Sequence, residues 1–320
     1  MADSEVAEEA GDDHIVTVLQ TWKTELVLAV RSEQDPGLKR WLDTVLREEV
    51  ADVEYRASRF RADSEVSMVN AGAGSWVETS WDFVTVLTAS LEAAAATEGL
   101  VDPLMGTHLV AAGYDTWAGE ESIIDAGTGS ARWQDIEVRP GGRQAQVRIP
   151  AGSALDLGAV TKGWLADRLA TTVHTSTGLD VLANMGGDLR VISPGEPWTV
   201  AADPDMPGID QLDLDIENAG LATSGISHRA WDSGHHIIDP RTGEPAITCW
   251  RSVSVIAAEA AGANAASTAA LILSDGGPQW LAGMGLDGWF VGAPGEPAGA
   301  PVQRAVGALQ QLLEQAGTEA

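Results

Sequence analysis

The chain has 320 residues, of which 44% are hydrophobic and 21% charged, a balance typical of a globular protein with a large core. Its net charge of -28 and pI near 4.3 argue against binding to a nucleic-acid backbone or an anionic membrane. A single cysteine, Cys249, excludes a disulfide within the chain and a cysteine metal cluster. An anionic nucleotide could still bind where backbone N–H groups, arginines or a divalent cation gather locally.

The N-terminal residues 1–14 are acidic and contain no apolar stretch, so we expect a disordered tail followed by one domain over residues 15–320. The tail matches neither a secretory nor a lipoprotein signal, and no apolar run is long enough to span a bilayer. These features predict a cytoplasmic protein. Cys249 is expected to be a buried small apolar residue and not a nucleophile.

The first half of the chain is predicted to mix helices with strands and ordered loops. In chain order we expect strand residues over 15–30 with a break near Gln20, a helix over 37–53, an arginine-rich ordered loop over 58–70, a helix over 81–97 and a loop over 100–113. Residues 117–142 are polar with scattered Trp and indicate a variable insertion or hairpin. A strand-like run over 146–150 precedes a further helix.

After Gly178 the pattern changes to short strands. The expected strands are 179–183, 189–192, 198–202, 212–216, 252–257 and 288–291. Helical spacing returns over 262–273 and 278–285, and a terminal amphipathic helix is expected over 302–315. Helices mixed with hairpin-like strands predict an α+β fold, as a single large domain of mixed sheets with packed helices.

The most informative segment is LDLGAVTKGWLAD at residues 155–167, which places an acid, a glycine turn and a lysine at the start of a helix. Free N–H groups at a helix start suit a phosphate. Lys162 adds a positive charge, and Asp156 can accept from a ring or ribose hydroxyl. The alternative is an ordinary loop with a surface lysine. Only Lys23 and Lys39 occur elsewhere, so a casual lysine here is less expected.

Histidines gather in ATSGISHRAWDSGHHIIDPRTGEP at residues 222–245. The adjacent His235 and His236 point to opposite faces if the chain is extended, so at most one of them faces a given pocket. A zinc site would also need His228 and Asp239, and we prefer a non-metal interpretation because no cysteine lies nearby.

The segment ANAASTAALIL at residues 263–273 places Asn264 and Thr268 on one face of a helix. Oxygen ligands at that spacing suit Mg²⁺ bridging to a diphosphate. On chemistry alone we favour the structural alternative, an Asn cap followed by a Thr bonded to the helix backbone. Asn brings no charge, and the positive end of the helix dipole opposes a cation.

Two further segments carry both a structural and a functional interpretation. In SRFRADSEVSMVN at residues 58–70, Phe60 can stack on a flat ring, while Ser64 and Glu65 can cap a short helix. Arg241 lies in a Pro–Gly turn, where it either completes a plain hairpin loop or binds a phosphate.

These segments occur together and in order, and the chain resembles the ApbE family, the FAD:protein FMN transferases. The matching segments are SRFRADSEVSMVN, GLVDPLMG, LDLGAVTKGWLAD, LANMGGDLR, LATSG, HHIIDPRTG, SVSVIA and ANAASTAALIL. The resemblance runs from about Thr17 to Leu273. It implies that family's α+β fold and an enzyme that splits the FAD diphosphate with Mg²⁺. FMN would pass to a Thr or Ser hydroxyl of an acceptor protein, and AMP would leave.

The resemblance also implies roles for individual residues. The FAD contacts would be Phe60, Leu100, Val101, Asp102, Asp156, Lys162 and Ile237. The metal positions would be the Ala159 carbonyl, Asn264 and Thr268, with Ser267 as a lesser candidate. Apart from the resemblance, diphosphate transfer needs charge neutralisation, which we expect Mg²⁺ and Lys162 to supply. We expect His236 to assist deprotonation of the acceptor hydroxyl because it lies beside Ile237 in the sequence.

Three departures from the family pattern bear on activity. Asn264 replaces an acid, so the expected affinity for Mg²⁺ falls. Leu19-Gln20-Thr21 stands in place of Met-Gly-Thr, which is expected to narrow the approach to the flavin, and Ala159 replaces a glycine. We therefore weigh an active transferase against an FAD-binding protein that has lost transfer activity, and against an FAD diphosphatase in which water is the acceptor. Neither nucleic-acid binding nor membrane insertion is expected.

Overall fold

The computed structural model describes residues 13–117, 120–122, 124–127, 129–202, 209, 211–227, 229–231, 234–294 and 301–318. Most of the expected acidic tail, residues 1–12, lies outside this part of the chain. The last residue of that expected tail, His14, already begins the first strand.

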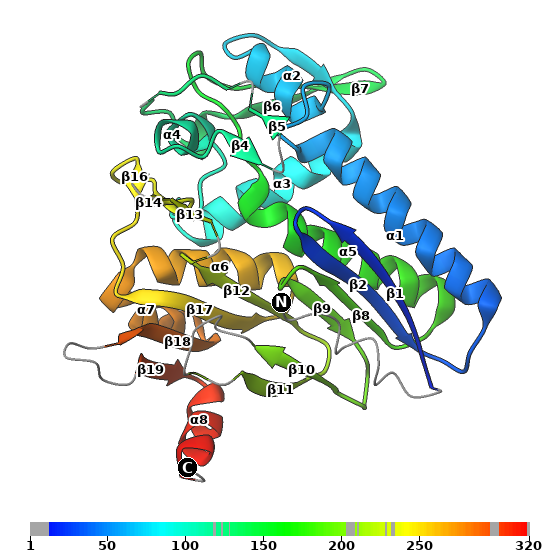
Figure 1. Cartoon of the computed structure of the whole chain (residues 1–320). Helices are drawn as coiled ribbons and strands as arrows, with labels where there is room; N and C mark the ends of the chain where they lie inside the picture. Colours follow the sequence, from blue (N-terminus) through cyan, green and yellow to red (C-terminus); the bar gives the residue numbers. More distant parts are fainter. Residues whose placement is uncertain are drawn as a thin grey trace.

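An eight-stranded antiparallel sheet forms the base of the molecule (Figure 1). Its strands, in spatial order, are β1 (His14–Thr21), β2 (Thr24–Arg31), β8 (Val181–Met185), β9 (Leu189–Ile192), β12 (Gly220–Gly225), β17 (Trp250–Ala257), β18 (Asp287–Pro294) and β19 (Pro301–Val306). The break expected near Gln20 is the two-residue turn Trp22–Lys23 between β1 and β2. The pairing of β1 with β2 continues without a shift to Thr21 and Thr24, the residues that flank the turn.

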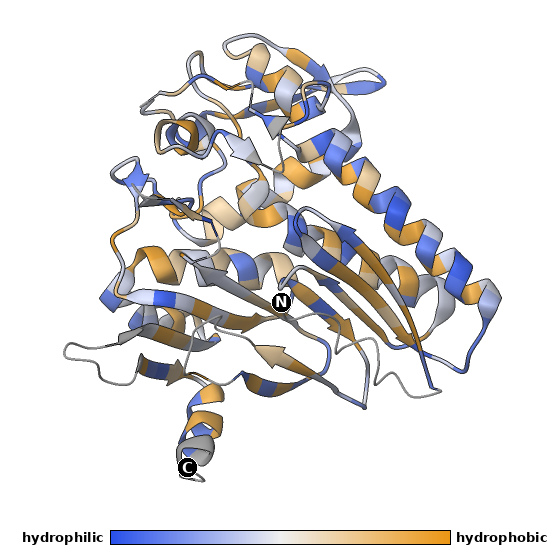
Figure 2. Cartoon of the chain, viewed as in Figure 1, coloured by the Kyte–Doolittle hydropathy of each residue, from blue (hydrophilic) through white to orange (hydrophobic). Residues whose placement is uncertain are grey.

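Four helices cover the sheet: α1 (Pro36–Ala57), α5 (Gly158–Thr177), α6 (Ala260–Ile272) and α7 (Gly277–Met284). In α1 the buried residues Leu42, Leu46, Val50 and Val53 repeat at helical spacing, so one stripe packs with α5 against β1, β2 and β8. Helices α6 and α7 pack against β17 and β18. Figure 2 shows the apolar residues gathered on these facing surfaces. In the described part of the chain, no helix is both long and apolar enough to cross a membrane.

The opposite face of the sheet packs against the hairpin β10 (Trp198–Ala202) and β11 (Leu212–Ile216) and against Leu309 of α8 (Leu309–Thr318). Above the helices stands a second layer (Figure 1). It contains α2 (Glu65–Ala71), α3 (Trp81–Ala96), α4 (Gly106–Ala111) and a small sheet of β3 (Val77–Thr79), β7 (Gln144–Arg148) and β6 (Glu137–Gly141). Its core joins α2, α3 and β7 to the segment before α5.

The remaining elements are short. They are β4 (Thr116–Trp117), β5 (Glu120–Glu121), β13 (Ala230–Trp231), β14 (Gly234–His235), β15 (Ile238–Asp239), β16 (Glu244–Pro245) and the 3₁₀ turns η1 (Trp133–Asp135) and η2 (Ser274–Gly276). The α+β prediction is confirmed.

Three sequence expectations are wrong in detail. The loop expected over residues 100–113 contains α4. The terminal helix expected over 302–315 is instead β19 followed by α8, because residues 301–306 pair with β18 and supply ladder partners for that strand. Cys249 is exposed and not buried. By contrast, Ser64 caps α2 as expected, accepting from the Ser67 N–H.

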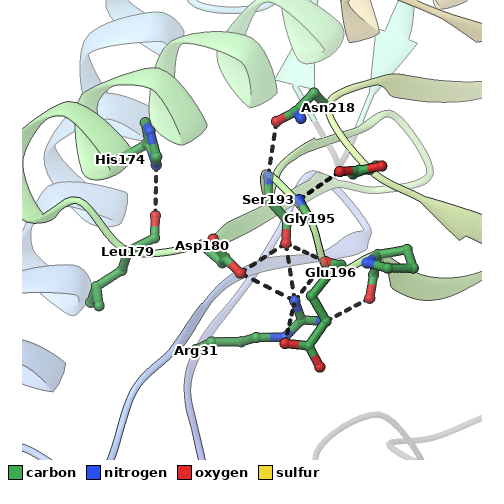
Figure 3. Close-up of polar contacts among 10 residues, drawn as sticks. Arg31, His174, Leu179, Asp180, Ser193, Gly195, Glu196 and Asn218 are labelled. Carbon is green, nitrogen blue, oxygen red and sulfur yellow. Dashed lines mark hydrogen bonds and ion pairs between the residues drawn. The ribbon is translucent and has the colours of Figure 1, made fainter.

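A polar cluster closes the sheet at the far end of β2 from the Trp22–Lys23 turn (Figure 3). Arg31 donates to Asp180 Oδ2 at 3.2 Å, to Ser193 Oγ at 3.0 Å and to the carbonyls of Glu196 and Pro197 at 2.7 and 2.6 Å. One guanidinium thus ties β2 to the start of β8 and to the loop after β9.

Helices α5 and α6 approach each other closely at Gly163. A Cβ atom built on Gly163 would lie 2.8 Å from the Ala260 carbonyl and from the Ala261 nitrogen. Both Asp167 carboxylate oxygens accept from the start of α6, at 2.8 Å from the Ala260 N–H and 2.9 Å from the Ala261 N–H. Helix α5 therefore both packs against α6 and caps it.

We predict that Gly163→Ala lowers the free energy of unfolding by about 1–3 kcal/mol, because the added methyl meets rigid backbone. Gly283→Ala is the matched control, since a Cβ there meets nothing within 4 Å on the exposed side of α7. Denaturant unfolding of both variants measures the difference. Equal stability of Gly163→Ala and the wild type would contradict the close contact.

Candidate functional site

A cavity of about 510 Å³ opens where the two layers meet, a volume within the usual range for small-molecule sites. It is enclosed by the start of α5, one face of α6, the β1–β2 and β8–β9 turns, β12 and the loops before α4 and around β15. The predicted site residues that line it are Phe60, Leu100, Val101, Asp102, Asp156, Ala159, Lys162, His236, Ile237, Asn264 and Thr268. The segments with Asp156 and Lys162, with Ile237, and with Asn264 and Thr268 therefore converge in space.

The start of α5 forms one wall of the cavity. Asp156 Oδ1 accepts from the Gly158 N–H at 2.8 Å, so this side chain closes the turn that begins the helix. Its Oδ2 atom accepts from Arg59 Nε at 2.5 Å. Arg59 is buried and also donates to the Tyr114 carbonyl. Asp156 is thus an anchor for the turn as well as a cavity residue, and Ala159 lies one residue into the helix.

Lys162 is the cation at the centre of the site. Its Nζ donates to the Gly186 carbonyl at 3.3 Å and lies 4.0 Å from Asp188 Oδ2. Burial lowers the pKa of Lys162, and the Asp188 carboxylate opposes this effect. The surface-lysine alternative is therefore wrong, because only 22% of the side chain is exposed.

Helix α6 contributes the opposite wall. Asn264 Nδ2 donates to Asp188 Oδ1 at 2.9 Å, whereas Asn264 Oδ1 and Asp188 Oδ2 are both buried without a hydrogen-bond partner among the described residues. Thr268 Oγ1 lies 2.7 Å from Ser224 Oγ on β12. The structural interpretation of Asn264 as a helix cap is wrong, because Glu259 holds that position.

Ser267 does not line the cavity. Its hydroxyl is fully buried, 2.8 Å from Ser224 Oγ, and donates to the Asn264 carbonyl at 3.0 Å. It packs behind Thr268, so a direct place in a metal site does not suit it.

An aromatic group borders the cavity around Tyr114. The Tyr114 ring lies edge-on to Phe60 at 5.7 Å between centroids, stacks with Trp231 at 6.0 Å and meets His236 at 6.2 Å. The Arg59 guanidinium lies 4.1 Å from the Phe60 ring centroid, a cation–π distance. Such a surface suits one face of a flat ring system.

His236 and His235 have different surroundings, as their alternation predicted. His236 lines the cavity, and its Nδ1 lies 3.3 Å from the Arg229 carbonyl. Donation from Nδ1 to that carbonyl leaves the lone pair on Nε2. Burial, reinforced by the charge of Arg229, lowers the pKa of His236 to about 3, so the ring is neutral at ordinary pH. His235 is bonded instead to the Ala246 carbonyl and the Ile237 N–H.

The zinc and phosphate-binding alternatives for this segment find no support among the described residues. His228 lies outside the described part of the chain. Asp239 accepts from Arg241 Nε at 2.9 Å and from Nη2 at 2.7 Å. Arg241 does not line the cavity, so this pair forms the turn and not a ligand clamp.

The loop before α4 closes a further side through Leu100, Val101 and Asp102. Asp102 accepts from the N–H groups of Leu104 at 2.8 Å and Trp133 at 3.1 Å, and burial raises its pKa. On β1, Gln20 faces solvent and donates to Glu25 at 2.6 Å. Its side chain does not narrow the cavity as expected.

Sequence reasoning missed several cavity residues, namely Trp22, Lys23, Tyr114, Asp188 and Arg229. The scarcity of lysine could have drawn attention to Lys23, and Asp188 lies within the segment LANMGGDLR that supported the resemblance. Tyr114 and Arg229 carry no sequence signal of comparable strength. They reach the cavity only through the tertiary fold.

A larger groove of about 1000 Å³ runs between α3, α5, α6 and α7. It is lined by residues such as Trp81, Trp164 and Trp280, and none of the predicted site residues borders it. The predicted site residues that line a cavity therefore all lie in the smaller one.

The fold and this cavity define an α+β protein with a polar ligand site held between a helix-covered antiparallel sheet and a second layer. A model of the ApbE family matches residues 19–290. The chain belongs to the ApbE family.

Curated relatives and solved structures agree with this assignment. FAD:protein FMN transferase of Treponema pallidum is 31% identical over 247 residues, covering 69% of this chain and 68% of that protein. The corresponding protein of Rhodobacter capsulatus is 31% identical, covering 70% of this chain and 45% of that protein. The flavinyl transferase ApbE of Pseudomonas stutzeri, in apo form, superposes with a TM-score of 0.78 at 20% identity, covering 94% of this chain and 97% of that one. The ApbE protein of Thermotoga maritima gives a TM-score of 0.72 at 24% identity, covering 88% and 96%.

The Trp22–Lys23 turn at the cavity rim is strained. Both residues have positive φ, 53° and 56°, whereas such two-residue turns favour Asn or Gly. We predict that Lys23→Gly stabilises the fold by about 0.5–1 kcal/mol, because relief of a left-handed residue outweighs the entropy that glycine loses on folding.

Lys23→Ala is the control, since it removes the same side chain and keeps the strained φ. Denaturant midpoints of both variants decide the matter. If Lys23→Ala is stabilised as much as Lys23→Gly, the gain comes from the lost charge and not from the backbone.

Proposed function

We propose that this protein is an Mg²⁺-dependent FAD:protein FMN transferase, which passes FMN from FAD to a Thr or Ser hydroxyl of an acceptor protein and releases AMP. One observation carries the proposal. Lys162, Asp188 and Asn264 share one cavity with an aromatic wall, and one oxygen each of Asp188 and Asn264 accepts no hydrogen bond from the described residues. The chain belongs to a family whose relatives bear that enzyme name.

FAD would bind with its flavin ring near Phe60 and its adenine or ribose along Leu100, Val101 and Asp102. Ile237 would contact FAD partly through its backbone. Asp156 would contribute to FAD binding while it holds the turn before α5 through Arg59 and Gly158.

The residues present fit a hard divalent cation. The partnerless Asn264 Oδ1 and the Thr268 hydroxyl lie on the face of α6 that borders the cavity, and Ala159 borders it from α5. These are oxygen donors of the kind that Mg²⁺ accepts. When bound, Mg²⁺ would neutralise charge on the diphosphate.

The transfer step exchanges one P–O bond for another. The acceptor hydroxyl oxygen forms a bond to the FMN phosphorus, and the bond from that phosphorus to the oxygen of AMP breaks. Because its low pKa makes His236 a weak base, its Nε2 takes the hydroxyl proton only as the new P–O bond forms and the attacking oxygen becomes acidic. Lys162 stabilises the negative charge that develops on the phosphate oxygens and on departing AMP.

Two other activities remain outcomes of the test. The neutral Asn264 motivates an FAD-binding protein without transfer, which would be yellow and release no AMP. An FAD diphosphatase would release AMP equally with and without acceptor protein.

The proposal predicts a fluorescent flavin band that survives denaturing electrophoresis when the protein, FAD and Mg²⁺ are added to cell extract. AMP release, measured by chromatography, should rise with the acceptor. Lys162→Met should reduce both signals by about 100-fold or more. The matched control is Lys39→Met, whose lysine is half exposed on α1. Absence of a flavin band and of acceptor-dependent AMP from the wild type would overturn the proposal.

The pKa of His236 gives a second prediction. Because that pKa lies near 3, the ring keeps its lone pair on acidification to pH 5. The ratio of kcat/KM between wild type and His236→Gln should therefore be large, about 100-fold or more, and constant from about pH 5 to about pH 8.

Taking a ratio cancels the titration of every other group. His174→Gln is the control, because His174 lies at the end of α5 and is bonded to the Leu179 carbonyl (Figure 3). A ratio that rises tenfold through pH 6.5 would instead mean that His236 titrates as an ordinary histidine.

A further inference from the structure

The neutral residue at position 264 leaves the metal position of α6 without a charge of its own. A buried carboxylate stands directly beside it. Asp188 follows the Gly186–Gly187 turn between β8 and β9, and only 3% of the residue is exposed. Its Oδ1 accepts from Asn264 Nδ2 at 2.9 Å. The charge missing from α6 is therefore present on the neighbouring turn.

The hydrogen bond also fixes the orientation of both groups. Because the Asn264 amide nitrogen donates to Asp188, Oδ1 is the free end of the side chain, and it is buried with no hydrogen-bond partner in the part of the chain that the structure describes. Asp188 Oδ2 is likewise buried without a hydrogen-bond partner, with Lys162 Nζ at 4.0 Å. Two such oxygens beside one cavity are costly unless a donor or a cation satisfies them.

We infer that Asp188 supplies the negative charge of the divalent-cation site and that Asp188 and Asn264 act as one pair. Asn264 presents a neutral oxygen, Asp188 presents the charge, and the hydrogen bond between them holds both in place. This inference rests on the proposed function, since it concerns the cation of that reaction. It assigns a role to Asp188 that the sequence resemblance does not give it.

Because the two residues are paired, the single substitution Asn264→Asp is a poor test of the site. In Asn264→Asp a second carboxylate would lie at hydrogen-bond distance from Asp188. Like charges that share a site disfavour ionisation of one of them, so the added acid need not add charge. Exchanging the two residues keeps one acid and one amide in contact.

The experiment compares wild type, Asp188→Asn, the exchanged double variant Asp188→Asn/Asn264→Asp, and the control Asp213→Asn. Asp213 is an exposed acid on β11. Mn²⁺ replaces Mg²⁺ as the probe, and electron paramagnetic resonance measures free Mn²⁺ in the presence of FAD. Flavin fluorescence measures the metal dependence of FAD binding in the same samples.

We expect Asp188→Asn to weaken Mn²⁺ binding by about 10-fold or more, and the exchanged variant to recover to within about threefold of wild type. Asp213→Asn should match the wild type. Asp188→Asn with unchanged affinity, or an exchanged variant that binds as weakly as Asp188→Asn, would overturn the inference. If Asp188→Asn does not fold by circular dichroism, the exchanged variant decides alone against the wild type: Mn²⁺ affinity within about threefold supports the inference, and affinity about 10-fold or more weaker overturns it.

Failure of this inference is distinct from failure of the proposed function. In the first case the wild type still shows metal-dependent FAD binding and AMP release, and the variants bind metal without regard to Asp188. In the second case the wild type itself binds no FAD or transfers no flavin.

Discussion

The site depends on the contact between α5 and α6. Gly163 lets the two backbones approach, and Asp167 holds the first N–H groups of α6. Burial raises the pKa of Asp167 to about 6, because the ionised carboxylate loses solvation in this position. The result is a fixed spacing between Lys162, one residue before Gly163, and Asn264, one turn into α6.

The strong negative charge of the molecule makes the positive side chains of the cavity important for binding an anion. With a net charge of -28, the surface repels an anionic dinucleotide at long range. Lys23, Lys162 and Arg229 line the cavity. Two of its acids, Asp102 and Asp156, are hydrogen-bonded to neighbouring groups of the protein. Asp102 and Asp156 accept from backbone N–H groups, and Asp156 also from Arg59. Asp188 differs from both, because one of its oxygens has no hydrogen-bond donor.

The sequence predicted the α+β class and most elements, because apolar periodicity reports which face of each element is buried. It failed where pairing decides the structure. Residues 302–306 contain apolar residues compatible with a helix, yet the open edge of β18 recruits them as β19. Helix α4 was missed because Pro103 and the flanking glycines resemble a loop. Only the assembled fold determines such cases.

The candidate site divides in the same way. Asp156, Lys162, Asn264 and Thr268 lie in segments with a recognisable order, so a resemblance could place them. Tyr114 and Arg229 reach the cavity through tertiary packing. Asp188 lies in a segment that supported the resemblance, but its distance from Asn264 cannot be read from a separation of 76 residues. Lys162, which the sequence placed, contacts Asp188, whose position only the fold shows. Its Nζ donates to the Gly186 carbonyl and lies 4.0 Å from Asp188 Oδ2.

The contact between Lys162 and Asp188 implies that Lys162 has different partners before and after a cation binds. Without a divalent cation, the charge of the buried Asp188 carboxylate is balanced by Lys162, whose Nζ lies 4.0 Å from Oδ2. A divalent cation at the oxygens of Asp188 and Asn264 would compete with Lys162 for that carboxylate, and would release the lysine charge toward the diphosphate. Lys162 would then serve as a placeholder for the metal in the free protein and as a phosphate ligand in the complex. The Asp188 carboxylate would couple the two roles of Lys162, because binding a divalent cation would weaken its attraction to the lysine.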